Sequence, residues 1–185
     1  MKVTQTKLSG ALIFEPKVFG DERGFFMETW NQQRYKEAGL DVNFVQSNLS
    51  KSAKGVLRGL HFQNPNPQGK LVQILTGEVF DVAVDIRKDS PTFGQWHGEI
   101  LTGDNHKQFY IPEGFAHGFC VLSDTAIFSY MCTNLYSPKD ETSLKWNDAR
   151  IAIDWPINKP NLSEKDKNAL TLDEIPSHKL PQYKP

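Results

Sequence analysis

The sequence predicts an all-β protein, either a sandwich or a barrel, from the spacing of its strand-like runs and from their alternation. Before Asp140, short runs of strand-forming residues recur at intervals of about 8–12 residues and are separated by glycine, proline or short polar turns. Residues 79–86 alternate with a period of two, which is typical of a strand with two different faces. One face carries Phe80, Val82, Val84 and Ile86, and the other carries Val79, Asp81, Ala83 and Asp85.

The first elements are expected to be strands that end at turns, followed by one short helix. The strand runs within 10–30 break at Glu15–Pro16 and again at Gly20–Asp21. A helix is expected over 31–40, because Asn31 can cap its first turn and Gly39 can end it in the left-handed conformation.

The middle of the chain continues with strands. Residues 42–63 contain two strand runs around a polar turn that carries lysines, and the prolines of 64–69 predict a loop. Residues 70–88 predict a tight hairpin that turns at Gly77. The runs 93–101, 107–122 and 125–136 extend the same pattern.

The last part of the chain has a different composition. Prolines and capping signals follow Asp154, above all in LSEKDKNALTLDEI. We therefore expect one domain over 1–185, with a short helical tail from about residue 155 packed on its outside.

Composition excludes several classes of function. The net charge of −1 gives no overall field that would attract nucleic acid or an anionic membrane. No apolar run approaches the roughly 20 residues of a membrane-spanning helix. The N-terminal residues lack the apolar core of a signal peptide, and Cys120 and Cys132 are too few for a disulfide framework. We expect free thiols and a cytoplasmic protein.

Several polar side chains lie within these apolar strands, where burying each without a partner would cost about 1–3 kcal/mol. They are His61, Lys70, Asp81, His117 and Tyr130. Taken singly, each has an ordinary structural explanation, such as a hydrogen-bonded histidine, a core tyrosine, an exposed aspartate or a solvated lysine. Arg23 is equally a turn residue, and Asp166 is equally the N3 residue of a capping box, Ser163-Glu164-Lys165-Asp166.

Two kinds of site would explain the whole set. Barrels of this kind often bind a metal through histidines at i and i+2 on one strand, but Gln63 follows His61 at that spacing, and His97 and His117 are single. The same residues fit metal-free acid–base chemistry, which needs a histidine base oriented by a carboxylate, a tyrosine acid and cations for an anionic ligand.

Six motifs follow one another along nearly the whole chain: DERGFFMETW, FVQSNLSKSAKGVLRGLHFQ, QGKLVQILTGEVFDVAVDIR, YIPEGFAHGFCVL, YMCTNLYSPKDE and LSEKDKNAL. Together they resemble the dTDP-4-dehydrorhamnose 3,5-epimerase family. The resemblance implies a cupin-type double-stranded β-helix (jelly roll) with short peripheral helices, a homodimer, no metal and no organic cofactor. It implies inversion of C3 and C5 of dTDP-4-dehydro-6-deoxy-D-glucose, giving dTDP-4-dehydro-L-rhamnose for dTDP-L-rhamnose and cell-wall polysaccharide biosynthesis.

The resemblance also implies roles for individual residues. The catalytic set is His61 as base, Tyr130 as acid, Asp166 as the carboxylate that orients His61, and Lys70 near the C4 oxygen, with Asp81 supporting His117. The implied substrate contacts are Arg23, Glu28, Gln46, Ser47, Asn48, Arg58, His117, Tyr136, Glu141 and Lys165. Tyr136 would stack on the thymine, and the segment from Arg23 to Glu28 would serve the pocket of the neighbouring subunit.

A regular strand would place Arg58 and His61 on opposite faces, because they are three positions apart. Both reach one ligand only if the strand is irregular, so we predict a β-bulge or sharp twist at Gly59. Two alternative functions stay open. One is a mono-epimerase or ketoisomerase that acts on a related dTDP-4-keto-6-deoxy sugar, and the other is a non-catalytic sugar-binding cupin.

Overall fold

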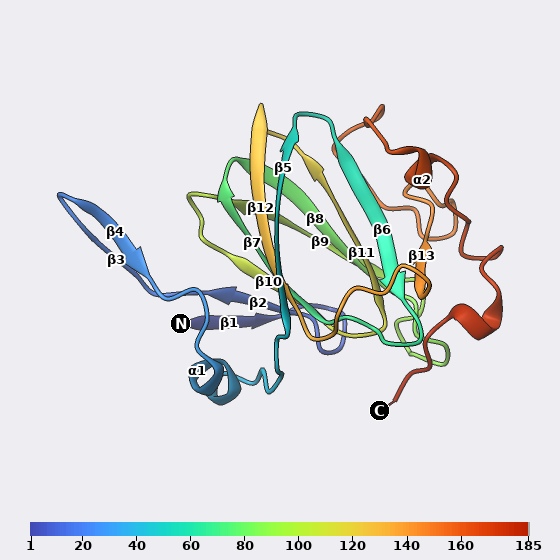
Figure 1. Cartoon of the computed structure of the whole chain (residues 1–185), viewed down its shortest axis with the longest axis horizontal. Helices are drawn as coiled ribbons and strands as arrows, with labels where there is room; N and C mark the ends of the chain where they lie inside the picture. The colour runs from blue at the N-terminus through green and yellow to red at the C-terminus, as the bar shows by residue number, and fades with distance from the viewer. Residues whose placement is uncertain (185) are drawn as a thin grey trace.

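The computed structural model describes residues 1–184, and its main body is a pair of antiparallel sheets packed face to face (Figure 1). In spatial order, the six-stranded sheet contains β1 (Lys2–Gln5), β2 (Leu12–Glu15), β10 (Gln108–Ile111), β7 (Lys70–Thr76), β12 (Thr125–Cys132) and β5 (Gln46–Ala53). The five-stranded sheet contains β13 (Glu141–Ser143), β6 (Leu57–Gln63), β11 (Phe115–Val121), β8 (Glu78–Asp85) and β9 (Trp96–Thr102).

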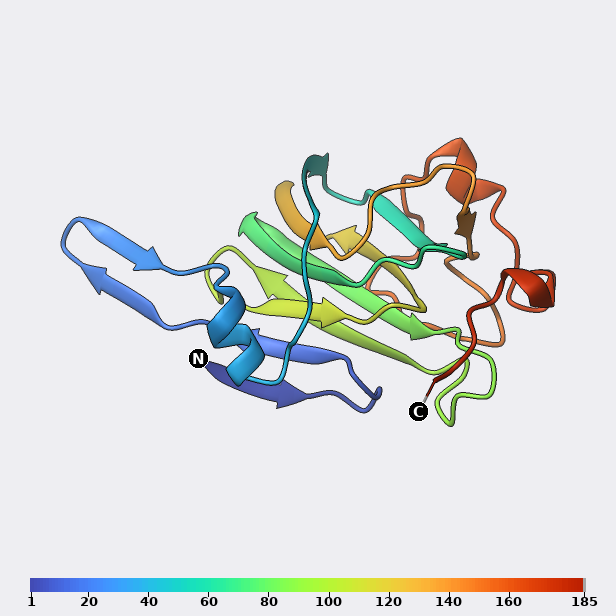
Figure 2. The same ribbon diagram turned by 60° about the horizontal axis from the view of Figure 1, so that its bottom comes forward.

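The smaller elements lie at the periphery. β3 (Val18–Asp21) and β4 (Gly24–Met27) form a separate two-stranded hairpin that projects from the body (Figures 1 and 2). The helices are short: α1 (Gln32–Glu37), α2 (Glu164–Lys167) and the 3₁₀ turn η1 (Ser177–Lys179). Within residues 1–184, no helix has both the length and the hydropathy needed to cross a membrane.

The order of the strands identifies the fold. Between β5 and β12 the chain changes sheet at every connection except the one from β8 to β9. Repeated crossing between two antiparallel sheets is the jelly-roll arrangement of a double-stranded β-helix. The predicted all-β jelly roll with short peripheral helices is confirmed.

The predicted hairpin at residues 70–88 is wrong. β7 and β8 occupy the predicted positions, but they belong to opposite sheets, and Gly77 forms the corner between them. Gly77 has a φ of +87°, and a Cβ there would collide with the backbone of Thr125 and Ala126. The period-two pattern located two strands, but it carries no information about which strands pair.

The two predicted faces of residues 79–86 are confirmed. Val79 and Ala83 join the core between the sheets, whereas Val82 and Val84 join a second apolar cluster on the outside of the five-stranded sheet. Both faces are buried because the C-terminal segment covers the outer one. That segment contributes Ile151, Trp155, Leu172 and Ile175.

The predicted helix near residue 31 is also confirmed. The Asn31 side chain accepts a hydrogen bond from the backbone N–H of Arg34 at 3.2 Å, and Gly39 follows the helix with a φ of +97°. Tyr35 is buried against Phe14, which fixes α1 on the outside of the six-stranded sheet.

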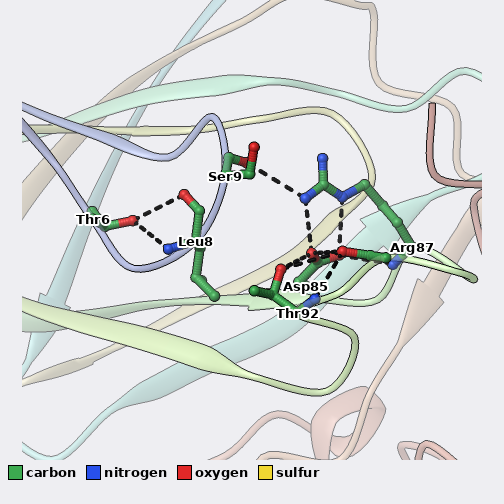
Figure 3. A network of polar contacts seen from close by, with 7 residues as sticks. Thr6, Leu8, Ser9, Asp85, Arg87 and Thr92 are labelled. Atoms are coloured by element: carbon green, nitrogen blue, oxygen red, sulfur yellow. Dashed lines mark hydrogen bonds and ion pairs between the residues drawn. The ribbon is translucent and has the colours of Figure 1, made fainter. Parts of the chain in front are cut away.

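A polar network stabilises the turn that follows β8 (Figure 3). Asp85 is fully buried at the end of β8, and its carboxylate accepts hydrogen bonds from the side chains of Arg87, Ser90 and Thr92 at 2.6–2.9 Å. The Arg87 guanidinium also lies over the rings of Phe115 and Tyr183. The network ties the turn after β8 to the end of the chain.

Candidate active site

A cavity of about 640 Å³ opens between the sheets and is closed on one side by the C-terminal tail. Both sheets and the tail contribute side chains to it, which places residues far apart in sequence around one space. Its lining includes Ser50, Arg58, His61, Lys70, His117, Phe119, Phe128, Tyr130, Asn161, Leu162, Ser163, Lys165 and Asp166.

The predicted irregularity at Gly59 is confirmed. Arg58 pairs with Phe119 and His61 pairs with His117, so β6 uses one residue more than β11 over the same stretch. Gly59 has a φ of +130°, and a Cβ there would lie 2.5 Å from the Cα of Gly118. This bulge brings Arg58 and His61 into the same cavity.

His61 is joined to Asp166 across the cavity wall. Its Nε2 lies 2.6 Å from Oδ1 of Asp166, which is 3 % exposed and belongs to α2. Burial alone would raise the pKa of Asp166, but hydrogen bonds from His61 and Ser163 bring this pKa below its ordinary value. Asp166 is therefore an anion that can hold His61 in one tautomer, with Nε2 protonated and Nδ1 free to accept a proton.

Asp166 pairs with His61 and forms one half of the predicted capping box. Ser163 caps α2 by accepting a hydrogen bond from the Asp166 backbone N–H at 3.2 Å, while the Asp166 carboxylate binds His61. The other half differs: in a capping box the side chain at N3 accepts the backbone N–H of the N-cap residue, whereas the Asp166 side chain accepts a hydrogen bond from the Ser163 hydroxyl at 2.8 Å.

A second histidine–aspartate pair lies deeper in the cavity. Nε2 of His117 is 3.0 Å from both carboxylate oxygens of Asp81, and Asp81 is fully buried. Burial lowers the pKa of His117, while the nearby charge of Asp81 opposes that change. The exposed position that was one alternative for Asp81 is wrong.

Lys70 begins β7 and lines the cavity. Burial lowers the pKa of its ammonium group, and nearby anionic groups, Asp81 and Glu141 among them, oppose this change. Lys70 is therefore not the solvated loop lysine that its position beside Gly69 also allowed.

Tyr130 enters the same cavity from β12. Its ring packs edge-on against Phe128, which stacks on Phe119 with ring centroids 4.1 Å apart. Burial raises the pKa of the Tyr130 phenol above its ordinary value. At neutral pH the phenol keeps its proton, as a group that donates a proton must.

The predicted nucleotide contacts form a polar rim beside the cavity. Lys165 forms an ion pair with Glu141 at 2.9 Å, and the half-exposed Tyr136 donates its hydroxyl to the same carboxylate at 3.1 Å. Gln46 accepts a hydrogen bond from the Tyr136 backbone N–H and donates its amide to Asn48. Arg58 donates Nε to Ser52 at 3.0 Å.

Three predicted contacts lie away from the cavity of their own chain. Arg23 is on the projecting hairpin and pairs with Asp21, and Glu28 pairs with Arg34. Ser47 is exposed on the opposite face of β5 from Asn48, beside a different hollow. Alternation along β5 turns Ser47 away from this cavity, and its role as a substrate contact stays a prediction.

The sequence reasoning missed three polar residues of the lining. Ser50 shares the inward face of β5 with Gln46 and Asn48, so alternation was a sufficient signal for it. Asn161 and Ser163 belong to the tail, where only the capping role of Ser163 has a local signal. Their place in the cavity depends on how the tail folds back along β6.

This arrangement can move protons. An imidazole paired with a carboxylate, a phenol that keeps its proton and a lysine surround a space large enough for a sugar ring. A base, an acid and a cation are the groups that an enolate-forming reaction beside a carbonyl requires.

Comparisons with known proteins agree with this chemistry. A family model described as dTDP-4-dehydrorhamnose 3,5-epimerase matches residues 5–174. The enzyme of that name from Shigella flexneri is 61 % identical over 170 residues, which cover 91 % of this chain and 94 % of the relative.

A solved structure agrees with this family model, and a more distant relative is named a 3-epimerase. The crystal structure of dTDP-6-deoxy-D-glucose-3,5-epimerase RmlC from Legionella pneumophila Philadelphia 1, in complex with dTDP-4-keto-L-rhamnose, aligns with a TM-score of 0.97 at 53 % identity. This alignment covers 100 % of this chain and 99 % of that chain. A relative from Streptomyces niveus named dTDP-4-dehydrorhamnose 3-epimerase is 39 % identical over 94 % of this chain and 85 % of its own length.

Proposed function

The chain belongs to the dTDP-4-dehydrorhamnose 3,5-epimerase family and is an isomerase of dTDP-rhamnose biosynthesis, and we propose that His61 and Tyr130 carry its chemistry. The substrate is dTDP-4-dehydro-6-deoxy-D-glucose, and inversion at C3 and C5 gives dTDP-4-dehydro-L-rhamnose. The single observation that carries this assignment is the cavity in which the His61–Asp166 pair, Lys70 and Tyr130 meet.

His61 is the base in this mechanism. Its Nε2 proton is held by Asp166, so the lone pair on Nδ1 removes the proton from the carbon beside the C4 carbonyl. The two electrons of the C–H bond move into the ring and then onto the C4 oxygen, which gives an enolate. The imidazolium that forms is stabilised by the Asp166 carboxylate.

Tyr130 completes each inversion by donating its phenolic proton to the opposite face of the same carbon. The Lys70 ammonium is placed to stabilise the C4 oxyanion, because a buried cation interacts more strongly with a developing charge than a solvated one. His117 lines the cavity and contacts the sugar, and the fully buried Asp81 holds the His117 ring through Nε2.

The nucleotide occupies the polar rim. Arg58 and Lys165 supply the cations for the diphosphate, and Gln46 and Asn48 supply amides for polar groups of the nucleoside. Tyr136 is half exposed beside Glu141, in a position where its ring can stack on the thymine. The ligands bound by the relatives, dTDP-4-keto-L-rhamnose among them, support a dTDP-sugar as substrate.

We propose that the protein is a cytoplasmic homodimer, and the hairpin of β3 and β4 supports the pairing of two chains. Phe19, Phe25 and Phe26 are each more than half exposed on it, which is costly for an arm with no partner. Arg23 lies on the same hairpin, outside the cavity of its own chain. In a dimer, this arm delivers Arg23 and Glu28 to the pocket of the neighbouring subunit.

Mixed dimers test this arrangement. His61→Ala and Arg23→Ala chains, each nearly inactive alone, are unfolded together and refolded in equal amounts. If Arg23 serves the neighbouring pocket, every mixed dimer has one complete site, and about a quarter of the wild-type rate returns on random pairing. No gain on mixing would show that Arg23 serves its own chain or that the chains do not pair.

Deuterium incorporation tests the reaction itself. In deuterated water the wild-type protein is expected to introduce deuterium at both C3 and C5 of the keto-sugar nucleotide, as read by NMR. Tyr130→Phe is expected to retain proton removal yet fail to complete inversion. Incorporation at one carbon alone would instead indicate a mono-epimerase, and none at either would indicate a binding protein.

A further inference from the structure

The two oxygens of the Asp166 carboxylate have different partners. Oδ1 lies 2.6 Å from Nε2 of His61, and Oδ2 accepts a hydrogen bond from the hydroxyl of Ser163 at 2.8 Å. Two bonds from opposite sides fix the plane of a carboxylate, whereas one bond leaves it free to rotate about the Cβ–Cγ bond. The orientation of Oδ1 toward His61 thus depends on the bond to Oδ2.

Ser163 uses its hydroxyl on Asp166 alone. The single O–H proton goes to Oδ2, and the oxygen accepts the backbone N–H of Asp166 at 3.2 Å. A hydroxyl has one proton to donate, so Ser163 cannot donate to a bound sugar while it donates to Asp166, although it lines the cavity. Both hydrogen bonds that its hydroxyl makes in the structure are to Asp166.

The tail holds Ser163 in place close to the catalytic strand. Two residues before it, the Asn161 carbonyl accepts the Leu57 N–H at 3.1 Å, and the Asn161 N–H donates to the Gly55 carbonyl at 2.7 Å. These bonds fasten the tail to the chain just before and at the start of β6, the strand that carries His61.

We propose that Ser163 is a positioning residue that orients the Asp166 carboxylate and, through it, the proton-accepting nitrogen of His61. This inference rests on the proposed function for the role of His61. The geometry of the Ser163–Asp166–His61 chain is independent of it and can be measured without substrate.

The same tail supplies a matched control. The Thr171 hydroxyl donates to the Glu174 carboxylate at 2.8 Å, again three residues ahead, and Glu174 also accepts the Thr171 backbone N–H. Neither residue lines the cavity. Thr171→Val removes the same kind of bond from the same tail without touching His61 or Asp166.

The variant for the test is Ser163→Gly, because glycine is a good N-cap residue and costs the helix only a few tenths of a kcal/mol relative to serine. It removes the bond to Oδ2 and keeps the turn. Ser163→Thr keeps both the cap and the hydroxyl and serves as the rescue variant.

The first measurement needs no turnover. The ring proton that His61 shares with Asp166 is followed by NMR and assigned by its loss in His61→Ala. In Ser163→Gly we expect it to exchange with water at least about tenfold faster, the usual effect of losing one hydrogen bond to a charged group. Ser163→Thr and Thr171→Val should leave it unchanged. An unaltered proton in Ser163→Gly would overturn the proposal, whatever reaction the protein catalyses.

The second measurement separates positioning from folding. We expect kcat to fall about 10-fold to 100-fold in Ser163→Gly while the affinity for dTDP stays the same. Lys165 lies in the same turn and is a proposed diphosphate contact, so a collapsed turn would weaken dTDP binding as well. Loss of kcat and dTDP affinity together would therefore overturn the positioning role. A wild-type protein that exchanges no substrate protons would instead refute the proposed function.

Discussion

Asp85 and Asp166 are both almost fully buried carboxylates, and they lie in two regions that the chain uses differently. The Asp85 carboxylate accepts its side-chain hydrogen bonds from Arg87, Ser90 and Thr92, all within seven residues of it. Asp166 is bonded locally to Ser163, but its other oxygen meets His61, which is 105 residues away, at the wall of a cavity of about 640 Å³.

The difference separates a structural carboxylate from the one that we propose to be functional. Around Asp85 the donors are an arginine and two hydroxyls, none of which changes its charge near neutral pH. The partner of Asp166 is an imidazole, which can gain a proton at its second nitrogen. Burial alone does not distinguish a structural carboxylate from a functional one. The two differ in whether the hydrogen-bond partner can change its charge and in whether a cavity lies beside that partner.

The largest effect should come from removing that partner. His61→Ala is expected to lower kcat by about 10²-fold to 10⁴-fold, the range for a positioned general base, without weakening dTDP binding. Steady-state rates and titration calorimetry measure the two effects. His178→Ala, at an exposed histidine of the tail, should keep the wild-type rate. A His61→Ala chain with more than a tenth of the wild-type rate would exclude His61 as the base.

The next effect should appear in stability. Asp85→Asn is expected to lower the free energy of unfolding by about 3–5 kcal/mol, the usual cost of removing one partner of a buried ion pair. Urea unfolding followed by fluorescence measures it, and kcat per folded molecule should stay at the wild-type value. If the variant kept its stability but lost its rate, the structural assignment of Asp85 would be wrong.

The smallest effect should be a change in how the free energy of unfolding depends on pH under acid conditions. Burial alone would raise the pKa of Asp85, but Arg87, Ser90 and Thr92 hold it below the ordinary value of 3.8. As the pH falls, the Asp85 carboxylate therefore binds a proton in the unfolded state at a higher pH than in the folded state. The stabilisation is complete above about pH 4 and is lost as the pH falls through the lower folded-state pKa.

Asp85→Asn should accordingly reduce the slope of unfolding free energy against pH in this acid range, by at most about 1.4 kcal/mol per pH unit. Urea titrations at several acid pH values provide the measurement. An equal slope in Asp85→Asn and the wild type would count against the lowered pKa.

Local pattern predicted a large part of the fold. The strands, the two faces of 79–86 and the capped helix at Asn31 follow from alternation and capping, which depend on neighbours in the sequence. The bulge at Gly59 was predictable because Arg58 and His61 had to reach one ligand. The hairpin at Gly77 failed because strand pairing is decided by packing between distant segments.

The residues of the site also divide into those that a local sequence pattern predicts and those that depend on packing between distant segments. The histidines and Tyr130 stood out as polar residues in apolar strands, and the family resemblance gave them roles. The cavity positions of Asn161 and Ser163 had no local signal, since the tail must first fold along β6. Arg23 is a third case, because the role that we propose for it depends on a second subunit that one sequence does not describe.

The most direct test of the comparison is the rate of deuterium incorporation at C3 and C5 in Asp166→Asn and Asp85→Asn, corrected for the folded fraction. We predict that Asp166→Asn loses about 10²-fold or more at both carbons, because an amide no longer holds His61 in its base form, while Asp85→Asn exchanges at the wild-type rate. Wild-type exchange in Asp166→Asn, or an equal loss in both variants, would contradict the division between the two carboxylates.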